Sequence, residues 1–443
     1  MLRLSTCAIS ITPDRPMALA GFGERSGLAE QVNDKLEAVF LLLRDAEGRG
    51  VVLGGVDTLF LTEPTLDAIR RAHGDLPEPV VLFATHTHSA PSLAPDLPLL
   101  GRHDAAWNTS VTAACGRAIR TLATDKAVGV PVTVRYGERP TDLNVNRRKP
   151  AWVLDYPALL RERRFSFRRC IALAENPRGV IDRRVRAVFL EDEAGVVRAV
   201  VWSLAAHPVA FPDGNRVSAD FPGQVRRALR QRFGEQCAVV YLPGLAGSAR
   251  PRVPRHLTTK WKEAVAALLP FWPSIRSFTP GLYRRWVDRL VRDILDAYGT
   301  RDPATGPGRI AVSHDTAAGV FRGRNPGATR DLHLTRLRLA PGLEILGCNG
   351  EPTGAWENLI GPEVPDATLR SGYLAGPAFY VPTSPEIREG GYEVTGFQHC
   401  FDCPGDFDPD ISGRVLASVR QLYRSRPVTG ASPVAQTTLN TLG

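Results

Sequence analysis

The sequence lacks the features that mark a membrane-spanning or secreted protein. Its 443 residues contain no uninterrupted apolar run of the length, about 18 residues, that spans a bilayer. The segment from Met1 to Cys7 includes a basic residue, but no continuous apolar stretch or small-residue cleavage site follows it. We therefore expect no transmembrane segment, no secretion signal and a cytoplasmic location.

Cysteine is also scarce and shows no regular spacing. The chain has seven cysteines, an odd number spread along its length, which does not indicate a disulfide framework. Cys400 and Cys403, just after His399, form one local cluster. A zinc site of this kind needs a second matching pair, which is absent, so free thiols in a loop are the favoured interpretation.

A concentrated block of basic residues is missing as well. The formal net charge is +9, but the arginines alternate with acidic residues along most of the chain. The densest clusters, 147–149 and 161–164, have no helix-turn-helix, zinc-finger or RNA-binding signature beside them. We expect a small-molecule substrate as the partner and no nucleic acid. The oligomeric state is not indicated.

What is present is the composition of a soluble globular protein, 43% hydrophobic and 23% charged. Apolar runs and helical periodicities alternate, which predicts the α/β class. Strands are expected at 36–44, 50–56, 80–84, 130–136, 184–191, 197–206, 238–242, 309–312, 332–339 and 343–348, and helices at 63–73, 104–125, 221–233 and 408–423. Polar composition predicts loops at 142–149 and 243–252.

One domain is expected over residues 1–426. Within it, residues 253–305 contain Trp261, Trp272 and Trp286 among prolines and basic residues. This stretch predicts a mainly helical insertion that could form a lid or an interaction surface. Residues 427–443 are rich in Ser, Thr, Pro and Gly, which predicts a flexible tail.

Three of the expected strands end in candidate metal ligands. The apolar run 80–84 leads to His86 and His88, whose i, i+2 spacing puts both imidazoles on one face of an extended chain. Two further strands lead to His207 and to Glu351. Imidazoles with a carboxylate are the ligand set of a catalytic zinc ion. The histidine pair by itself is equally compatible with a solvated strand end.

Several motifs, in order, resemble the neutral/alkaline (non-lysosomal) ceramidase family. The segment Ile11-Thr12-Pro13 with Ala20-Gly21-Phe22-Gly23 resembles the family's opening "DITP…GYG", and the segment Thr85 to Pro91 resembles its "THTHSGPG". The segment Leu143 to Arg147 resembles "NINR", and His207 with Ser218 to Gly223 resembles "H…SGDNKG". The segment Gly350 to Thr353 resembles "PGEFT", and Tyr380 to Glu386 with Tyr392-Glu393 resembles "GYVTTREEY…YEG". Each match is weak, but together they cover residues 8 to 395. The resemblance implies mixed sheets flanked by helices, with the active site at the carboxyl ends of strands.

The resemblance also assigns roles to individual residues. It implies that zinc is held by His86, His207, Glu351 and Tyr380. It implies that His88, Arg147 and Tyr392 touch the substrate amide and stabilise the developing oxyanion. The residues alone leave alternatives open, because Tyr380 could be a packed aromatic and Arg147 a solvated loop charge.

Two aspartates are weaker candidates. Asp220 and Asp57 could each hold a ligand imidazole in the required tautomer, or could cap a turn. Asp220 is retained as a candidate substrate-binding residue.

The chain departs from the family at one functional motif. The family's "GDxSPN" segment, which carries an active-site serine, corresponds here to Gly247 to Arg252, with Arg250 at the serine position. A guanidinium fork suits a carboxylate or a phosphate. We expect Arg250 or Arg252 to bind an anionic group of a smaller, more polar substrate, unless a shifted alignment leaves both on the surface. We also expect no counterpart of the family's immunoglobulin-like carboxyl-terminal domain.

The sequence thus predicts a zinc-dependent hydrolase that uses zinc-bound hydroxide to cleave an amide (N-acyl) bond of a small substrate. An esterase, a lactonase, or an acyl-transfer or cyclisation enzyme would use the same site. A catalytically silent metal- or ligand-binding protein is the alternative outside the enzymes.

Overall fold

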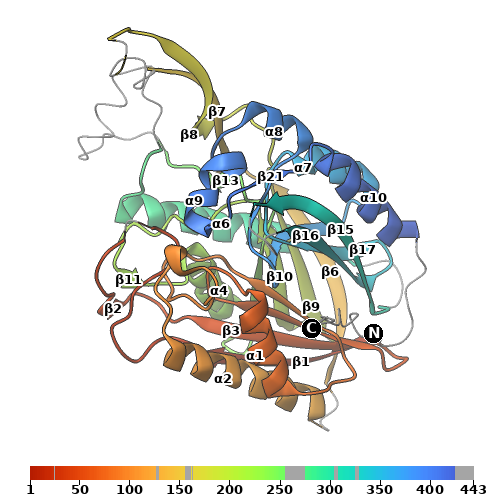
Figure 1. Ribbon diagram of the computed structural model, residues 1–443. Coiled ribbons are helices and arrows are strands. Elements are labelled where there is room, and N and C mark those ends of the chain that lie inside the picture. The colour runs from red at the N-terminus through yellow and green to blue at the C-terminus, as the bar shows by residue number, and fades with distance from the viewer. Residues whose placement is uncertain are drawn as a thin grey trace, which may run out of the picture.

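The centre of the computed structural model is one long sheet that folds back over itself (Figure 1). The structure describes residues 1–23, 25–125, 129–154, 161, 163–254, 275–303, 308–324 and 329–424. The sheet runs in the order β12-β10-β9-β6-β1-β3-β4-β5-β19-β17-β16-β15-β21, and β14 pairs with β6 outside this path. Because β12 also packs across β3, β4, β5 and β19, the two halves of the sheet form two layers.

Most strands of this sheet are long and apolar. Their bounds are β1 Leu2–Ser10, β3 Glu37–Arg44, β4 Gly50–Val56, β5 Val80–Ala84, β6 Val130–Pro140, β9 Arg184–Asp192, β10 Val197–Leu204, β12 Ala238–Pro243, β14 Asp302–Pro303, β15 Ala311–Gly323, β16 Arg330–Ala340, β17 Leu343–Asn349, β19 Thr368–Leu374 and β21 Gly405–Phe407. Three smaller sheets pair β2 Gln31–Val32 with β11 Arg216–Val217, β7 Asn144–Leu154 with β8 Phe167–Asn176 and β13 Ala249–Pro251, and β18 Glu351–Pro352 with β20 Tyr380–Val381.

Helices cover the outer faces of both layers. Their bounds are α1 Glu63–His73, α2 Ala105–Thr124, α4 Asp220–Phe233, α6 Pro280–Gly299, α7 Trp356–Ile360, α8 Ser384–Glu389, α9 Gln398–Phe401 and α10 Ile411–Arg424, with short turns η1 Pro98–Leu100, η2 Gly361–Glu363 and the π-helical η3 Tyr392–Gly396. Helices α1 and α2 pack on β3, β4 and β5, while α4 and α6 pack on β9, β10 and β12.

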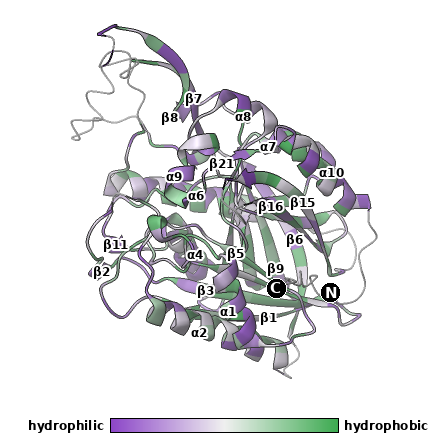
Figure 2. Ribbon diagram, in the orientation of Figure 1, coloured by the Kyte–Doolittle hydropathy of each residue, from purple (hydrophilic) through white to green (hydrophobic). Residues whose placement is uncertain are grey.

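Strand β3 shows why the sequence folds this way. Leu41 and Leu43 face the second sheet layer, whereas Phe40 and Leu42 face the helices, so both faces are buried. A strand covered on both sides needs a continuous apolar run instead of an alternating one. Figure 2 shows hydrophobic colours concentrated on these central strands. The expected mixed α/β architecture is confirmed.

Most expected elements are present with nearly the expected bounds. The hairpin of β3 and β4, the helices α1, α2 and α4, and the strand β5 before the histidines all form as the periodicity predicts. Two expected loops are wrong, because 142–149 lies largely in β7 and 243–252 contains β13. The polar side chains of these two segments form hydrogen bonds with one another inside the protein. A search for apolar runs does not find strands of this kind. Strand β1 was not expected.

Strands β7 and β8 form a hairpin whose outer part projects away from the body of the molecule (Figure 1). We call the described residues 149–154, 161 and 163–173 the arm. The inner end of β7, from Asn144 to Arg148, is built into the protein and pairs with β13. Strand β7 therefore runs from the interior of the protein to the outer part of the arm.

The expected helical insertion is only partly described. Residues 255–274, including Trp261 and Trp272, lie outside the described residues, as does the expected tail. Helix α6 packs on the sheet, and the buried Trp286 donates its indole N–H to the Leu143 carbonyl at 2.9 Å. Among the helices of the described residues, none is long and apolar enough to cross a membrane.

A buried ion pair joins α4 to the end of β4, the neighbour of the strand that precedes the histidines. Asp57, fully buried at the end of β4, accepts hydrogen bonds from Arg226 Nη2 at 2.7 Å and Thr85 Oγ1 at 3.1 Å. Burial raises the pKa of Asp57, although Arg226 opposes this shift. Asp57 thus holds Thr85, the residue before His86, in place. The negative charge of Asp57 is in turn stabilised by Arg226.

Replacing Arg226 with methionine should lower the free energy of unfolding by about 3 kcal/mol, because Asp57 is left as a buried, unpaired charge. Urea unfolding measures the change. The matched control is Arg227→Met on the exposed side of the same helix, which should stay within about 0.5 kcal/mol of wild type. Equal losses in the two variants would contradict the role given to the pair.

Candidate metal centre

The candidate ligands come from the ends of three strands. After β5 ends at Ala84, His86 adopts a left-handed backbone conformation with φ of 62°. His207 follows β10, and Glu351 follows β17 through Gly350, whose φ is 73°. A non-glycine residue in this conformation is uncommon, and it directs His86 differently from an extended chain. The turn brings His86 and His88 together by bending the chain.

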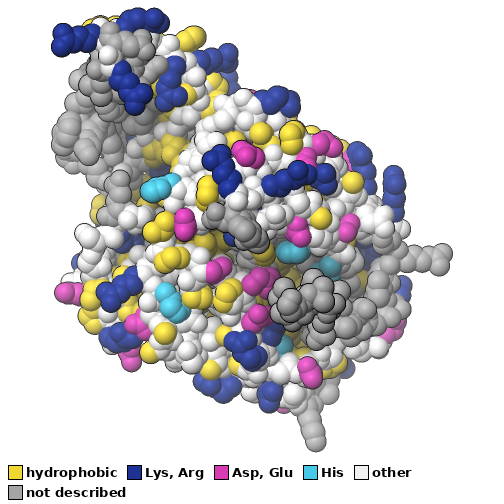
Figure 3. Space-filling model, in the orientation of Figure 1, with side chains coloured by type: hydrophobic (Ala, Val, Ile, Leu, Met, Phe, Trp, Pro, Cys, Tyr) yellow, Lys and Arg dark blue, Asp and Glu magenta, His cyan; other side chains and the backbone are white. Residues whose placement is uncertain are grey.

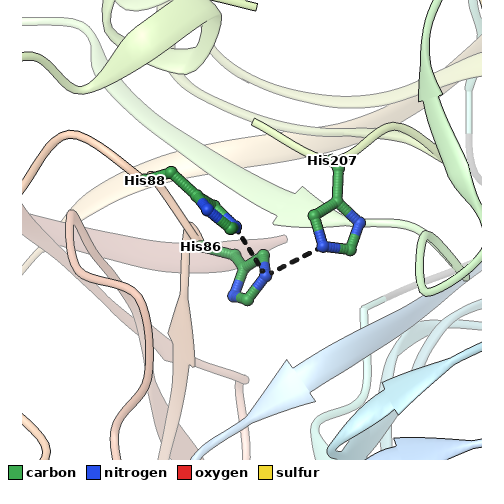
Figure 4. A group of neighbouring side chains, drawn as sticks. All are labelled: His86, His88 and His207. Carbon is green, nitrogen blue, oxygen red and sulfur yellow. Dashed lines mark hydrogen bonds between the residues drawn. The ribbon is translucent and has the colours of Figure 1, made fainter. Parts of the chain in front are cut away.

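The ligand atoms of these residues converge on one point. His86 Nε2 lies 3.1 Å from His207 Nε2 and 3.3 Å from His88 Nε2 (Figure 4). Glu351 Oε2 lies 3.0 Å from His207 Nε2 and 3.4 Å from His86 Nε2. His86, His207 and Glu351 are buried, and His88 is partly buried.

The hydrogen bonds of two histidines fix which nitrogen carries the proton. His86 Nδ1 lies 2.8 Å from the Leu59 carbonyl and His207 Nδ1 lies 2.9 Å from the Ala246 carbonyl. A carbonyl oxygen only accepts, so both Nδ1 atoms donate and both Nε2 atoms present lone pairs. Burial lowers the pKa of His207 to about 4 and that of His88 well below its usual value. Near neutral pH the imidazoles of His88 and His207 are therefore uncharged.

Lone pairs therefore face one another across about 3 Å, together with a carboxylate oxygen. Such a cluster of acceptors is repulsive unless a cation lies among them. Carbonyl partners on the remote nitrogens are the usual way in which proteins orient metal-binding imidazoles. The ligand nitrogens of His86, His88 and His207 all lie within 4.8 Å of one another. This centre fits a metal ion.

A hydrogen-bonded group of aromatic and basic residues lies beside the centre. In the pair β18·β20, Tyr380 stands opposite Glu351, so the backbone itself brings the phenol next to the carboxylate. Arg147 Nη2 donates to the Tyr380 hydroxyl at 3.0 Å, and its guanidinium lies 5.5 Å from the centre of the Tyr392 ring. Burial raises the pKa of Tyr380 well above its usual value. Three predicted site residues are thus in one group.

Glu393 completes this group, although the sequence did not identify it. The fully buried carboxylate accepts from Arg147 Nε and from Arg148 Nη1, each at 2.9 Å. It lies in the π-helical turn η3, one residue after Tyr392. In a sequence this rich in charge, a lone glutamate is indistinguishable from a solvated one. Only the adjacency to Tyr392 could have indicated it.

Tyr373 is a second residue that sequence reasoning missed. Its ring centre lies 4.4 Å from that of His86, and its hydroxyl reaches Glu351 Oε2 at 3.4 Å. Its φ of 62° is again left-handed. No sequence signal marks it apart from its place near the end of β19.

The amino-terminal glycine motif packs behind His88. A β-carbon on Gly21 would collide with the His88 ring, and the φ of Gly21 is 98°. Phe22 lies with its ring centre 4.9 Å from that of His88, and Arg25 Nη1 donates to the His88 carbonyl at 2.7 Å. Burial lowers the pKa of Arg25 to about 10. The amino-terminal glycine motif therefore sets the position of His88.

The two candidate pocket arginines have different surroundings. Arg250 pairs with Val145 in the β13·β7 ladder, which puts its side chain on the face of Arg147. It is 5% exposed, and its Nη2 donates to the Arg276 carbonyl at 3.1 Å. Arg252 has a half-exposed side chain 3.8 Å from Asp142. The expectation of a buried cation near the site therefore rests on Arg250.

Asp220 is engaged by the protein itself. Its carboxylate accepts from the backbone N–H groups of Ala210 and Phe211 at 2.8 and 3.1 Å, and from the Tyr283 hydroxyl at 3.1 Å. Burial raises its pKa to about 6. These contacts are those of a cap that holds the loop after His207 against α4, the alternative considered for this residue. A substrate contact of Asp220 stays a prediction.

The fold and the site define an α/β protein with a buried histidine centre that could hold a metal ion. Two solved structures share the fold: a neutral ceramidase from Pseudomonas aeruginosa, with a TM-score of 0.69, 15% identity and coverage of 98% of this chain and 76% of that chain, and a ceramidase in complex with C2, with a TM-score of 0.65, 16% identity and coverage of 99% and 78%. No family model matches the chain, and no curated protein matches it significantly. The expected neutral-ceramidase-like fold is confirmed.

Replacing Glu393 with glutamine should lower the free energy of unfolding by about 3 kcal/mol, because two buried guanidinium groups lose their shared carboxylate. Chemical unfolding provides the measurement. Glu389→Gln is the matched control, since that carboxylate also contacts Arg148, at 3.2 Å, but is half exposed and should contribute at most about 0.5 kcal/mol. A Glu393 variant as stable as this control would rule out the bridging role.

Proposed function

We propose that this protein is a zinc-dependent hydrolase that cleaves an amide (N-acyl) bond. The observation that carries the proposal is the convergence of His86, His207 and Glu351 beside the buried pair of Arg147 and Tyr380. Imidazole nitrogens with a carboxylate oxygen suit zinc, and a hydrolytic zinc site leaves a coordination position open. The likeness of the fold to ceramidases supports an amide as the scissile bond.

In the proposed site, His86, His207, Glu351 and Tyr380 hold the metal. A zinc ion there would supply a water of lowered pKa and would polarise the substrate carbonyl. Leu59 and Ala246 fix the imidazoles of His86 and His207 through their carbonyls, so these two rings remain oriented when substrate enters.

His88 differs from the other two histidines in a way that suits proton handling. Its Nδ1 atom is buried and has no hydrogen-bond partner among the described residues, so no described carbonyl fixes its tautomer. A ring with a free choice of tautomer can accept a proton on one nitrogen without breaking an existing bond. His88 is therefore assigned to the proton that the leaving amine requires, while its Nε2 atom remains close enough to join the ligands.

Arg147 is assigned to the developing oxyanion. Glu393 and Tyr380 hold its guanidinium from two sides, so the group is positioned before the reaction begins. The ring centre of Tyr392 lies 5.5 Å from that of Tyr380 in an edge-to-face arrangement, and Tyr392 is assigned as a second donor to the oxyanion. A fixed donor aimed at an oxyanion contributes about 3 kcal/mol of transition-state stabilisation.

Metal analysis tests the central claim. The purified protein should contain about one zinc ion per chain, as a single site of this kind requires. His86→Ala with His207→Ala should abolish zinc binding, whereas the exposed His399→Ala should leave it unchanged. Wild type without zinc after reconstitution, or a double variant that retains it, would refute the assignment.

Arg250 is proposed to bind a carboxylate of the substrate. A panel of neutral and carboxylated N-acyl amides tests this proposal. In Arg250→Ala, kcat/KM for carboxylated amides should fall about 10- to 100-fold, the value of a charge-assisted hydrogen bond, with a much smaller change for neutral amides. Arg252→Ala is the matched control. An equal loss of kcat/KM on both classes of amide would contradict the proposal.

A further inference from the structure

The arm carries exposed aromatic and basic side chains that the proposed reaction does not use. Trp152 is 62% exposed and Phe165 is 78% exposed, the latter being the most exposed large hydrophobic side chain of the described residues. Figure 3 shows dark blue Lys and Arg side chains spread over the arm, with yellow hydrophobic ones alongside. Burial of a Trp or Phe side chain is strongly favourable, so exposure of both on one projection indicates a surface that is covered when the protein works.

The charge of the arm has one sign. Residues 149–173 include six basic side chains and two acidic ones. The basic side chains of the described residues are Lys149, Arg161, Arg163, Arg164, Arg168 and Arg169, and all of them are exposed. None of the ion pairs in the described part of the chain includes any of these six. Unneutralised positive charge of this density attracts an anionic surface.

The register of the hairpin separates two faces. Trp152 stands opposite Arg169, and Leu154 stands opposite Phe167, so these four side chains share one face. A mixture of Trp, Phe and Leu with Arg is the composition of side chains that enter the interface of a bilayer, where the ring is buried and the guanidinium meets phosphate.

This face continues to the candidate active site. Ile171, which pairs with Pro150 on the same face, lies against Gly391, where an added β-carbon would be 3.0 Å from Ile171 Cβ. Gly391 directly precedes Tyr392. The inner end of β7 carries Arg147, so the face that meets a surface and the group that meets substrate belong to one pair of strands.

From these observations we infer that the arm docks the protein on an anionic lipid surface. The aromatic side chains enter the interfacial region, and the basic side chains contact lipid phosphates. The cytoplasmic leaflet, with its anionic lipids, is a surface of this kind. Docking depends neither on the metal nor on the reaction, so its test is separate from that of the proposed function.

Vesicle flotation with the full-length chain tests the inference. Wild type should float with phosphatidylcholine vesicles containing one third phosphatidylglycerol and stay unbound with phosphatidylcholine alone. Binding should weaken at high salt, because it depends on charge. Trp152→Ser with Phe165→Ser, and Arg163→Glu with Arg164→Glu, should each weaken binding at least about tenfold.

Matched controls lie on other surfaces of the molecule. Arg227→Glu with Arg232→Glu on α4 makes the same change in net charge, and Val196→Ser removes an exposed apolar side chain from another turn. Both should float like wild type. Thermal melting and hydrolysis of a short, monomeric amide should be unchanged in the arm variants, since Trp152, Phe165, Arg163 and Arg164 lie outside the site.

Three results would overturn the inference. The first is equal flotation of wild type and arm variants. The second is binding of duplex DNA or heparin through the arm without binding of vesicles, which would identify a different polyanion. The third is an arm-dependent dimer in sedimentation velocity with no flotation, which would make a second copy of the chain the occupant.

Discussion

The repulsion among buried hydrogen-bond acceptors is the constraint on which the site depends. The carbonyls of Leu59 and Ala246 force the lone pairs of His86 and His207 toward each other, and Glu351 adds a negative oxygen between them. The protein therefore uses left-handed backbone at His86 and a glycine before Glu351 to hold groups that would otherwise separate. A bound cation would turn this cost into stabilisation, so folding and metal binding would be linked.

The charges beside the centre form a second, connected layer. Glu393 joins Arg147, which faces the centre, to Arg148, which faces Glu386 on α8. The Glu386 side chain in turn bonds to Thr353, two residues after Glu351. A path of charge-assisted bonds thus leads from Arg147 around to the backbone that carries Glu351. Displacement of one member would shift the others, which keeps the candidate ligands and their neighbouring donors in register.

Sequence patterns predicted the apolar part of the molecule well and the polar part poorly. The strand 80–84 and the helix 63–73 form within the expected bounds, because continuous apolar runs and helical periodicity reflect burial directly. The inner part of β7 was expected as a loop, since Asn146, Arg147 and Arg148 look solvated in a linear sequence. Their partners, Ser248, Glu393 and Glu386, are 100 to 250 positions away, so no local pattern could reveal the pairing.

The same distinction explains what the resemblance to ceramidases conveys about substrate. Metal ligands stand at strand ends that the core fixes, so weakly similar sequences can still place them alike. Arg250 stands on β13, a short strand that pairs with β7 and whose Ala249 carbonyl accepts from the His207 backbone N–H at 3.0 Å. In the proposed function, Arg250 takes the place of the family's serine and puts a buried cation on the face of Arg147, which suits a carboxylate better than a neutral acyl chain. The proposal thus assigns cleavage of the bond to the residues at the strand ends and the choice of substrate to β13.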